Sequence, residues 1–122
     1  MKIEIREPQT INEWENYYTI RYEELRAPWG QPKGSEKDMN EDVAHQFALF
    51  LQNEMIGVLR LDETNDISTV QFRFMAIKSN FQGNSYGNIL MQHAETYAKK
   101  MHKKTVVLHA REKAISFYEK LG

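Results

Sequence analysis

The 122-residue chain contains no cysteine, and what else it lacks is equally informative. Without cysteine, disulfides and thiolate nucleophiles are excluded, and the composition suits a reducing cytoplasm. No apolar run approaches the roughly 20 residues that a membrane-spanning helix needs. The N-terminal residues Met1 to Arg6 alternate as a strand does, unlike a signal peptide. We therefore expect a cytoplasmic protein with no membrane partner.

A surplus of charge of one sign is also missing, since the net charge is −1. A nucleic-acid partner would need a basic stripe, so we expect none. The one basic cluster, residues 99–104, falls at the end of a predicted helix, where the helix dipole favours cations. The four histidines form no ligand cluster in sequence and no HExxH is present, so we expect no metal.

The periodicity of apolar residues predicts a single domain over residues 1–122 with a mixed α/β (α+β) fold. Strands are expected at 2–6, 45–52, 56–62, 69–77 and 105–110, and helices at about 10–25, 85–101 and 113–121. A long loop begins at residue 27, with a further short helix near 37–44. This order, β-α-(α)-β-β-β-α-β-α, predicts a mostly antiparallel central sheet with helices on both faces.

Strict alternation along the strand at 69–77 predicts two faces. Val70, Phe72, Phe74 and Ala76 would share one face, and Gln71, Arg73, Met75 and Ile77 the other. Arg73 would then point into a cleft, where a guanidinium suits a carboxylate or phosphate of a substrate. An ion pair with an acidic residue of a neighbouring strand explains Arg73 equally well.

Residues 75–91 carry the strongest functional signal: a buried strand, a polar loop with two glycines, then an amphipathic helix. Backbone N–H groups at a helix N-terminus lack intrahelical partners, and together with the helix dipole they attract phosphate. Gly83 and Gly87 allow the backbone to approach such a ligand closely. A plain chain reversal would use the same residues.

Two motifs in this chain resemble those of the GNAT superfamily, the acyl-CoA-dependent N-acetyltransferases. The segment Gln82-Gly83-Asn84-Ser85-Tyr86-Gly87 is similar to the family's Gln/Arg-x-x-Gly-x-Gly/Ala, with Ser85 at the middle glycine. The second motif, Asn-x-x-Ala-x-x-Phe-Tyr-x-x-x-Gly-Phe, is matched by Ala114, Phe117, Tyr118 and Gly122.

The resemblance implies acetyl-CoA (coenzyme A) as the co-substrate, bound at a strand that parts from its neighbour. Met75, Ala76 and Ile77 would lie along the pantetheine chain. The pyrophosphate would be held by Gln82, Gly83, Asn84, Ser85, Tyr86, Gly87 and Asn88.

It also implies catalytic roles. Tyr118 matches the general acid that protonates the departing thiolate, although a core tyrosine on an apolar helix face explains it too. One branch of the family places a glutamate base at the position of Gln71, and an amide cannot take a proton. His109, Glu63 or a water chain remain as alternatives, or the amine arrives deprotonated.

The acceptor implied by the resemblance is an amine of a small molecule or a protein. Arg26 and Trp29, in the long loop, would wall its site together with Arg73, although Trp29 equally suits a loop anchor. Family members continue beyond Leu121-Gly122 with two more strands, so we expect a C-terminally incomplete domain or a homodimer that supplies them. Two functions stay open: direct acetyl transfer to an amine, and a non-catalytic acyl-CoA-binding module.

Overall fold

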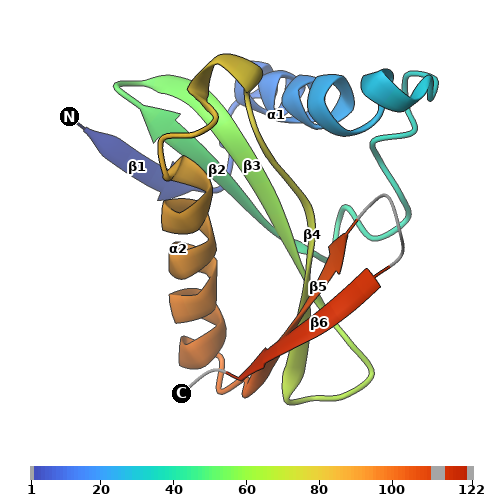
Figure 1. Cartoon of the computed structure of the whole chain (residues 1–122), viewed down its shortest axis with the longest axis vertical. Helices are drawn as coiled ribbons and strands as arrows, with labels where there is room; N and C mark the ends of the chain where they lie inside the picture. Colours follow the sequence, from blue (N-terminus) through green and yellow to red (C-terminus); the bar gives the residue numbers. More distant parts are fainter. Residues whose placement is uncertain (1, 111–114, 121–122) are drawn as a thin grey trace.

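The computed structural model describes residues 2–110 and 115–120, with side chains described up to residue 108. Up to residue 110, its strands and its two α-helices follow the sequence pattern, whereas the predicted helix at 37–44 is absent; Figure 1 shows how the elements are arranged. They are β1 (Ile3–Arg6), α1 (Ile11–Leu25), η1 (Ala27–Trp29), β2 (His45–Leu51), β3 (Glu54–Glu63), β4 (Thr69–Ile77), η2 (Ser79–Phe81), α2 (Tyr86–Lys100), β5 (Thr105–Ala110) and β6 (Ile115–Lys120).

The strands form one 6-stranded sheet in the order β1-β2-β3-β4-β5-β6. Neighbours are antiparallel except for β4 and β5, which are parallel because α2 forms the crossover between them. Helix α1 packs on one face of the sheet and α2 on the other (Figure 1). The predicted fold class, a mostly antiparallel sheet with helices on both faces, is therefore confirmed.

The two faces have separate apolar cores. Under α2, the helix residues Leu90, Ala94 and Ala98 meet buried strand residues such as Leu59 and Val106. Under α1, the helix presents Tyr17, Ile20 and Leu25; the strand residues there are Ala48, Phe50, Met55, Val58 and Ala76. Thr10 caps α1, since its hydroxyl accepts a hydrogen bond from the N–H of Glu13 at 3.1 Å.

A β-bulge interrupts β4 and corrects the predicted faces. Val58 pairs with Ala76 and Arg60 with Arg73, so Phe74 and Met75 of β4 both lie opposite one residue of β3. The extra residue reverses the alternation. Val70 and Phe72 lie in the core under α2, whereas Phe74 and Ala76 pack under α1. Met75 and Ile77 in turn belong to the α2 core, so Arg73 and Met75 do not share a face.

Two predicted helices are wrong. Residues 37–44 form turns, and residues 115–120 form β6, antiparallel to β5. The spacing of Ala114, Phe117, Tyr118 and Leu121 suits a helix, but Ile-Ser-Phe-Tyr also suits a strand, and β5 offers an open edge whose N–H and C=O groups need partners. Residues 111–114 and 121–122, which include Ala114 and Gly122 of the second motif, lie outside the described residues.

Candidate functional site

The loop between β4 and α2 is built as a series of turns that ends in exposed backbone amides. The N–H of Lys78 still bonds Ile56 O of β3 at 2.8 Å, and η2 follows. Gly83 and Ser85 then take positive φ angles of 84° and 68°. Within the described residues, the N–H groups of Gly83, Asn84 and Ser85 donate no hydrogen bond. They lie just before the first turn of α2, whose own N–H groups have no intrahelical acceptor.

Ser85 stands at the middle glycine of the motif and keeps a backbone conformation that favours glycine. It is the N-cap of α2 in the left-handed region, and its side chain makes no capping hydrogen bond. A non-glycine residue there is strained by on the order of 1–3 kcal/mol. The cap therefore leaves the amides unsatisfied, where a side-chain cap would have covered one of them.

Glu24 of α1 anchors the loop, and sequence reasoning did not find it. Its carboxylate accepts hydrogen bonds from the N–H and the hydroxyl of Ser79, each at 3.0 Å. Gln82 donates from Nε2 to Ile77 O at 2.9 Å. The motif glutamine thus ties the loop back to the end of β4. No spacing signal links residues 24 and 79, so only the structure reveals this contact.

Next to this loop, β4 and β5 separate. Their pairing runs from Thr69 and Thr105 to Phe72 and Leu108 and then stops. Beyond it, residues 73–77 of β4 have no strand partner on that side within the described part of the chain. The bulge at Phe74, with φ of 54°, lies where the strands separate. A strand edge with free backbone groups can pair with an extended ligand that carries amides.

The free edge and the free amides are contiguous, because Met75, Ala76 and Ile77 lead through η2 to the loop. A Cβ at Gly83 would meet nothing within 4 Å, so the space above this amide is open. A Cβ at Gly87 would lie 3.0 Å from Met75 Cε, which holds α2 close to β4. The residues from Met75 to Asn88 thus run from the free edge of β4, through the exposed amides of the loop, to the first turn of α2.

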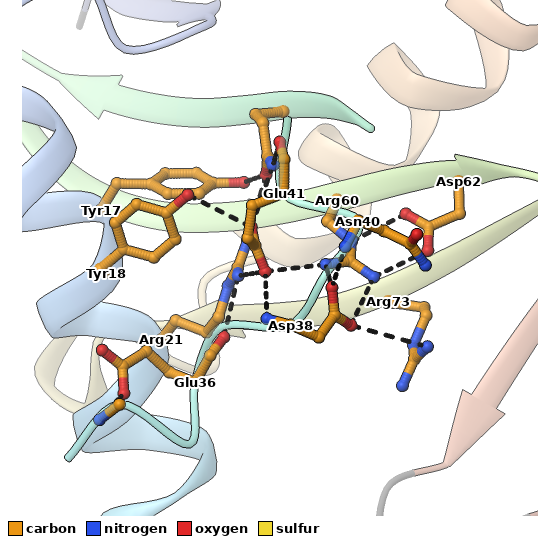
Figure 2. A network of polar contacts seen from close by, with 12 residues as sticks. Tyr17, Tyr18, Arg21, Glu36, Asp38, Asn40, Glu41, Arg60, Asp62 and Arg73 are labelled. Atoms are coloured by element: carbon orange, nitrogen blue, oxygen red, sulfur yellow. Dashed lines mark hydrogen bonds and ion pairs between the residues drawn. The ribbon is translucent and has the colours of Figure 1, made fainter. Parts of the chain in front are cut away.

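On the α1 face, the chain before β2 is held by a network of charged residues that sequence reasoning missed (Figure 2). Arg21 and Arg60 are fully buried. Arg60 binds Asp62 at 2.7 Å, Asp38 at 2.7 Å and Glu41 at 2.8 Å. Glu41 also binds Arg21 at 2.8 Å. These ion pairs fix residues 38–41 over β3 and β4.

The network shifts the acidity of its members. The Arg60 guanidinium lowers the pKa of Asp38. Burial of Glu41 opposes its ionisation, but the charge and hydrogen bond of Arg21 outweigh it and lower the pKa. Burial raises the pKa of Tyr18 to about 12, with Glu41 adding to the effect. All of these groups therefore keep their ordinary charge at neutral pH.

Four guanidiniums surround one aromatic ring at the edge of this network. The Cζ atoms of Arg21, Arg26, Arg60 and Arg73 lie 4.5, 5.5, 4.8 and 5.1 Å from the centroid of Phe74. The bulge causes this, because it puts the consecutive residues Arg73 and Phe74 on the same face. Arg73 reaches Asp38 only at 4.0 Å (Figure 2).

The remaining predicted residues are Trp29, His109, Tyr118 and Glu63. Trp29 lies in η1 and is 51% exposed. His109 is the first residue of β5 beyond the last pair with β4, and Tyr118 lies on β6 opposite Val107. The side chains of His109 and Tyr118 are outside the described residues. Glu63 binds Lys103 at 2.9 Å, which lowers its pKa and makes it a weak base.

No cluster of three or more metal-binding side chains occurs in the described part of the chain. Within that part, no helix combines the length and the apolar character needed to cross a membrane.

The family model described as Acetyltransferase (GNAT) family matches residues 11–122. The chain therefore belongs to the GNAT acetyltransferase family, as the two motifs indicated.

Solved structures share the fold. A Lactobacillus plantarum protein described as an N-acetyltransferase matches with a TM-score of 0.75 and 22% identity over 89% of this chain and 74% of its own. The PaiA N-acetyltransferase from Thermoplasma acidophilum, in complex with coenzyme A, matches with a TM-score of 0.72 and 18% identity. That match covers 93% of this chain and 82% of the PaiA chain. A GNAT family acetyltransferase from Elizabethkingia anophelis with acetyl-CoA bound matches with a TM-score of 0.68 and 23% identity. That match covers 87% of this chain and 63% of the Elizabethkingia chain.

Proposed function

We propose that this chain binds acetyl-CoA and transfers its acetyl group directly to an amine. The observation that carries the proposal is the continuity of two features: the free edge of β4 beyond Phe72, and the unpaired amides of Gly83, Asn84 and Ser85. Family membership supports acetyl transfer in general. The structures with coenzyme A or acetyl-CoA bound support the choice of ligand.

The chain's own groups have distinct tasks in this proposal. The backbone at Met75, Ala76 and Ile77 would hydrogen-bond the amides of pantetheine. The N–H groups from Gly83 to Asn88 would hold the pyrophosphate as a nest at the dipole end of α2. Gln82 would act indirectly, because its amide is engaged with Ile77 O and sets the loop's path.

The bound thioester supplies an activated acetyl group. A C–N bond to the amine forms and the C–S bond breaks; the amine loses one proton and the thiolate gains one. His109 or solvent would receive the proton from the amine, Tyr118 would donate its phenolic proton to the thiolate, and solvent would then reprotonate Tyr118. By backbone register, His109 is the first residue of β5 beyond its pairing with β4, and Tyr118 lies on β6 opposite Val107.

Calorimetry with coenzyme A tests the proposed binding site, and two glycine variants show whether the loop at Gly83 is part of that site. Gly83→Val puts a side chain into the open space above the loop, whereas Gly34→Val is a matched control with φ of 101° and equally open surroundings. Both substitutions carry similar backbone strain. We expect Gly83→Val to lose at least about tenfold in affinity, and Gly34→Val to bind as the wild type does. Equal affinities for all three proteins would contradict the proposal.

The alternative is a non-catalytic acyl-CoA-binding module. Gln71, which cannot act as a base, is the observation that favours it. Tyr118→Phe separates the two functions when CoA release is measured against a panel of amines. An enzyme that uses Tyr118 loses rate and keeps its affinity for coenzyme A, whereas a binding module releases no CoA in either form.

The proposed homodimer is a separate prediction. Sedimentation with and without coenzyme A measures it: a mass of one chain at every concentration would contradict it.

A further inference from the structure

Arg26 and Arg73 differ from the other described arginines in lacking a close carboxylate. Arg6, Arg21 and Arg60 each have one, at 2.9, 2.8 and 2.7 Å. Arg73 has only the 4.0 Å approach of Asp38, and the side chains of Arg26 and Arg73 donate no hydrogen bond to any described residue. The Nε of Arg26 is buried without a partner. A guanidinium has five donors, so both side chains have most of their hydrogen-bonding capacity unused.

The local charges do not balance around Phe74. The carboxylates of Asp38, Glu41 and Asp62 offset three guanidiniums, those of Arg21, Arg60 and Arg73. Arg26 adds a fourth positive charge against the same ring. The face of an aromatic ring attracts cations, but by much less than a carboxylate does. These seven groups comprise four guanidiniums and three carboxylates, and the buried Glu36 lies beside them, its backbone C=O accepting a hydrogen bond from Arg21 at 2.9 Å.

Arg26 and Arg73 also lie where a substrate would enter. Arg73 is the first residue of β4 beyond its pairing with β5. Arg26 is the C-cap of α1 and leads into η1. Two elements far apart in sequence therefore place their guanidiniums over the same ring, at the separation of the strands and on the face opposite α2. The side chain of Arg73 is 37% exposed, and Arg26 is half-buried.

From these observations we propose that the acceptor is an amine that also carries a carboxylate, and that Arg26 and Arg73 bind this carboxylate. The inference rests on the proposed acetyltransferase function and names its substrate class. A carboxylate supplies a negative charge and acceptors for the unused donors of Arg26 and Arg73, and its two oxygens match the planar fork of a guanidinium. Both oxygens of Asp38 already accept hydrogen bonds from Arg60, at 2.7 and 3.0 Å, and Asp38 approaches Arg73 only at 4.0 Å.

Kinetics with matched amine pairs test the proposal. Glycine, β-alanine and L-lysine are compared with glycinamide, β-alaninamide and cadaverine by CoA release. The pairs differ in amine basicity, but this difference is the same for every protein variant, so the change in the ratio of kcat/KM isolates the carboxylate. We expect Arg26→Gln and Arg73→Gln each to lower kcat/KM about 10- to 100-fold for the acids, and to change it less than about threefold for the neutral partners.

Arg6→Gln is the matched control, because Arg6 also lies over a phenylalanine ring, 4.3 Å from the centroid of Phe50. It should leave the ratio unchanged. Arg26→Lys and Arg73→Lys keep the charge and should retain part of the preference. Thermal unfolding of each variant establishes that it is folded. Equal losses for acids and neutral partners would overturn the proposal, and so would a stronger response with aminomethylphosphonate than with glycine.

A binding measurement separates this inference from the proposed function. Calorimetry with N-acetylglycine and N-acetylglycinamide, each with and without coenzyme A, needs no turnover. Tighter binding of the acid that is lost in Arg26→Gln and Arg73→Gln supports the carboxylate site, even if coenzyme A does not bind. Binding of coenzyme A with no preference for the acid overturns the carboxylate site and leaves the acetyltransferase proposal standing.

Discussion

The two faces of the sheet are built from different chemistry. Under α2 the contacts are apolar, with Leu90, Ala94 and Ala98 fully buried against strand residues. Under α1 a smaller apolar core adjoins buried guanidiniums and carboxylates that hold residues 38–41 on the sheet. Adjacent residues of β3 show the contrast directly: Leu61 faces the apolar core, and Arg60 the ionic network.

The two faces contribute differently to stability and to geometry. Burying charge costs much of what the ion pairs return, so the network adds little net stability over an apolar core. It does impose geometry, because each carboxylate accepts hydrogen bonds from fixed directions. We infer that the α2 face stabilises the fold and that the α1 face positions the chain around Phe74, where the acceptor would bind.

The largest expected effect comes from removing the centre of the network. Arg60→Met leaves Asp38, Glu41 and Asp62 without their shared cation, and we expect a loss of about 3–5 kcal/mol in the free energy of unfolding at pH 7. Leu61→Ala, on the other face, should lose about 2–5 kcal/mol through a cavity. Urea denaturation measures both.

The pH distinguishes the two causes. Acid neutralises part of the Asp38 charge that Arg60→Met strands, so the deficit of Arg60→Met relative to the wild type should be smaller at pH 3, while that of Leu61→Ala stays the same. An Arg60→Met deficit that does not change with pH would show that the network is not ionic in the way described.

Acid should next weaken the α1 face of the wild-type protein. The folded-state pKa values of Asp38 and Glu41 are lowered from ordinary values of 3.8 and 4.5. Their contribution to stability is therefore complete above pH 5 and is lost as the pH falls through the folded-state values. Thermal unfolding from pH 6 to pH 2 should show a falling Tm. Asp38→Asn should flatten this slope, whereas an unchanged slope in that variant would assign the acid sensitivity elsewhere.

A smaller loss is expected where the network meets the apolar core of the α1 face. The hydroxyl of Tyr17 donates to Leu59 O at 3.0 Å or Gln46 Oε1 at 2.7 Å in a fully buried position. Tyr17→Phe should cost about 1–2 kcal/mol. Since Gln46 keeps its bond to Arg21, a loss much larger than this would mean that the network rearranges.

The smallest effects concern the two helix N-termini. Thr10→Ala removes the cap of α1 and should cost about 1 kcal/mol. Ser85→Gly at α2 removes no cap and relieves a positive φ, so it should raise stability by about 0.5–1 kcal/mol. Chemical denaturation measures both. Destabilisation by Ser85→Gly would mean that its hydroxyl has a structural role that the present geometry does not show.

Local patterns predicted most elements up to residue 110. Helix α1 begins after Thr10, and β5 spans the expected Thr105–Ala110. The motif residues Gln82 to Gly87 span the end of the loop and the start of α2, as the pattern of a loop followed by a helix predicted. These features depend on caps, alternation and glycine spacing, all of which act between close neighbours in sequence.

The wrong predictions concern segments whose structure depends on residues far away in the sequence. The bulge at Phe74 depends on register with β3, so alternation alone put Arg73 and Met75 on one face. The strand at 115–120 depends on the edge of β5, which overrides a helical spacing. The same holds for the site: Arg21 and Glu41 are ordinary surface residues by type, and only the fold brings them together.

The topology also has a consequence for folding kinetics. Strands β2, β3 and β4 form a meander of short-range contacts, whereas β5 joins β4 only after a crossover of more than 25 residues, so its docking is entropically slower. We expect the meander to form in the rate-limiting transition state and the edge that includes β5 to assemble afterwards. A ligand that binds at this late-forming edge should then slow unfolding and leave the refolding rate nearly unchanged.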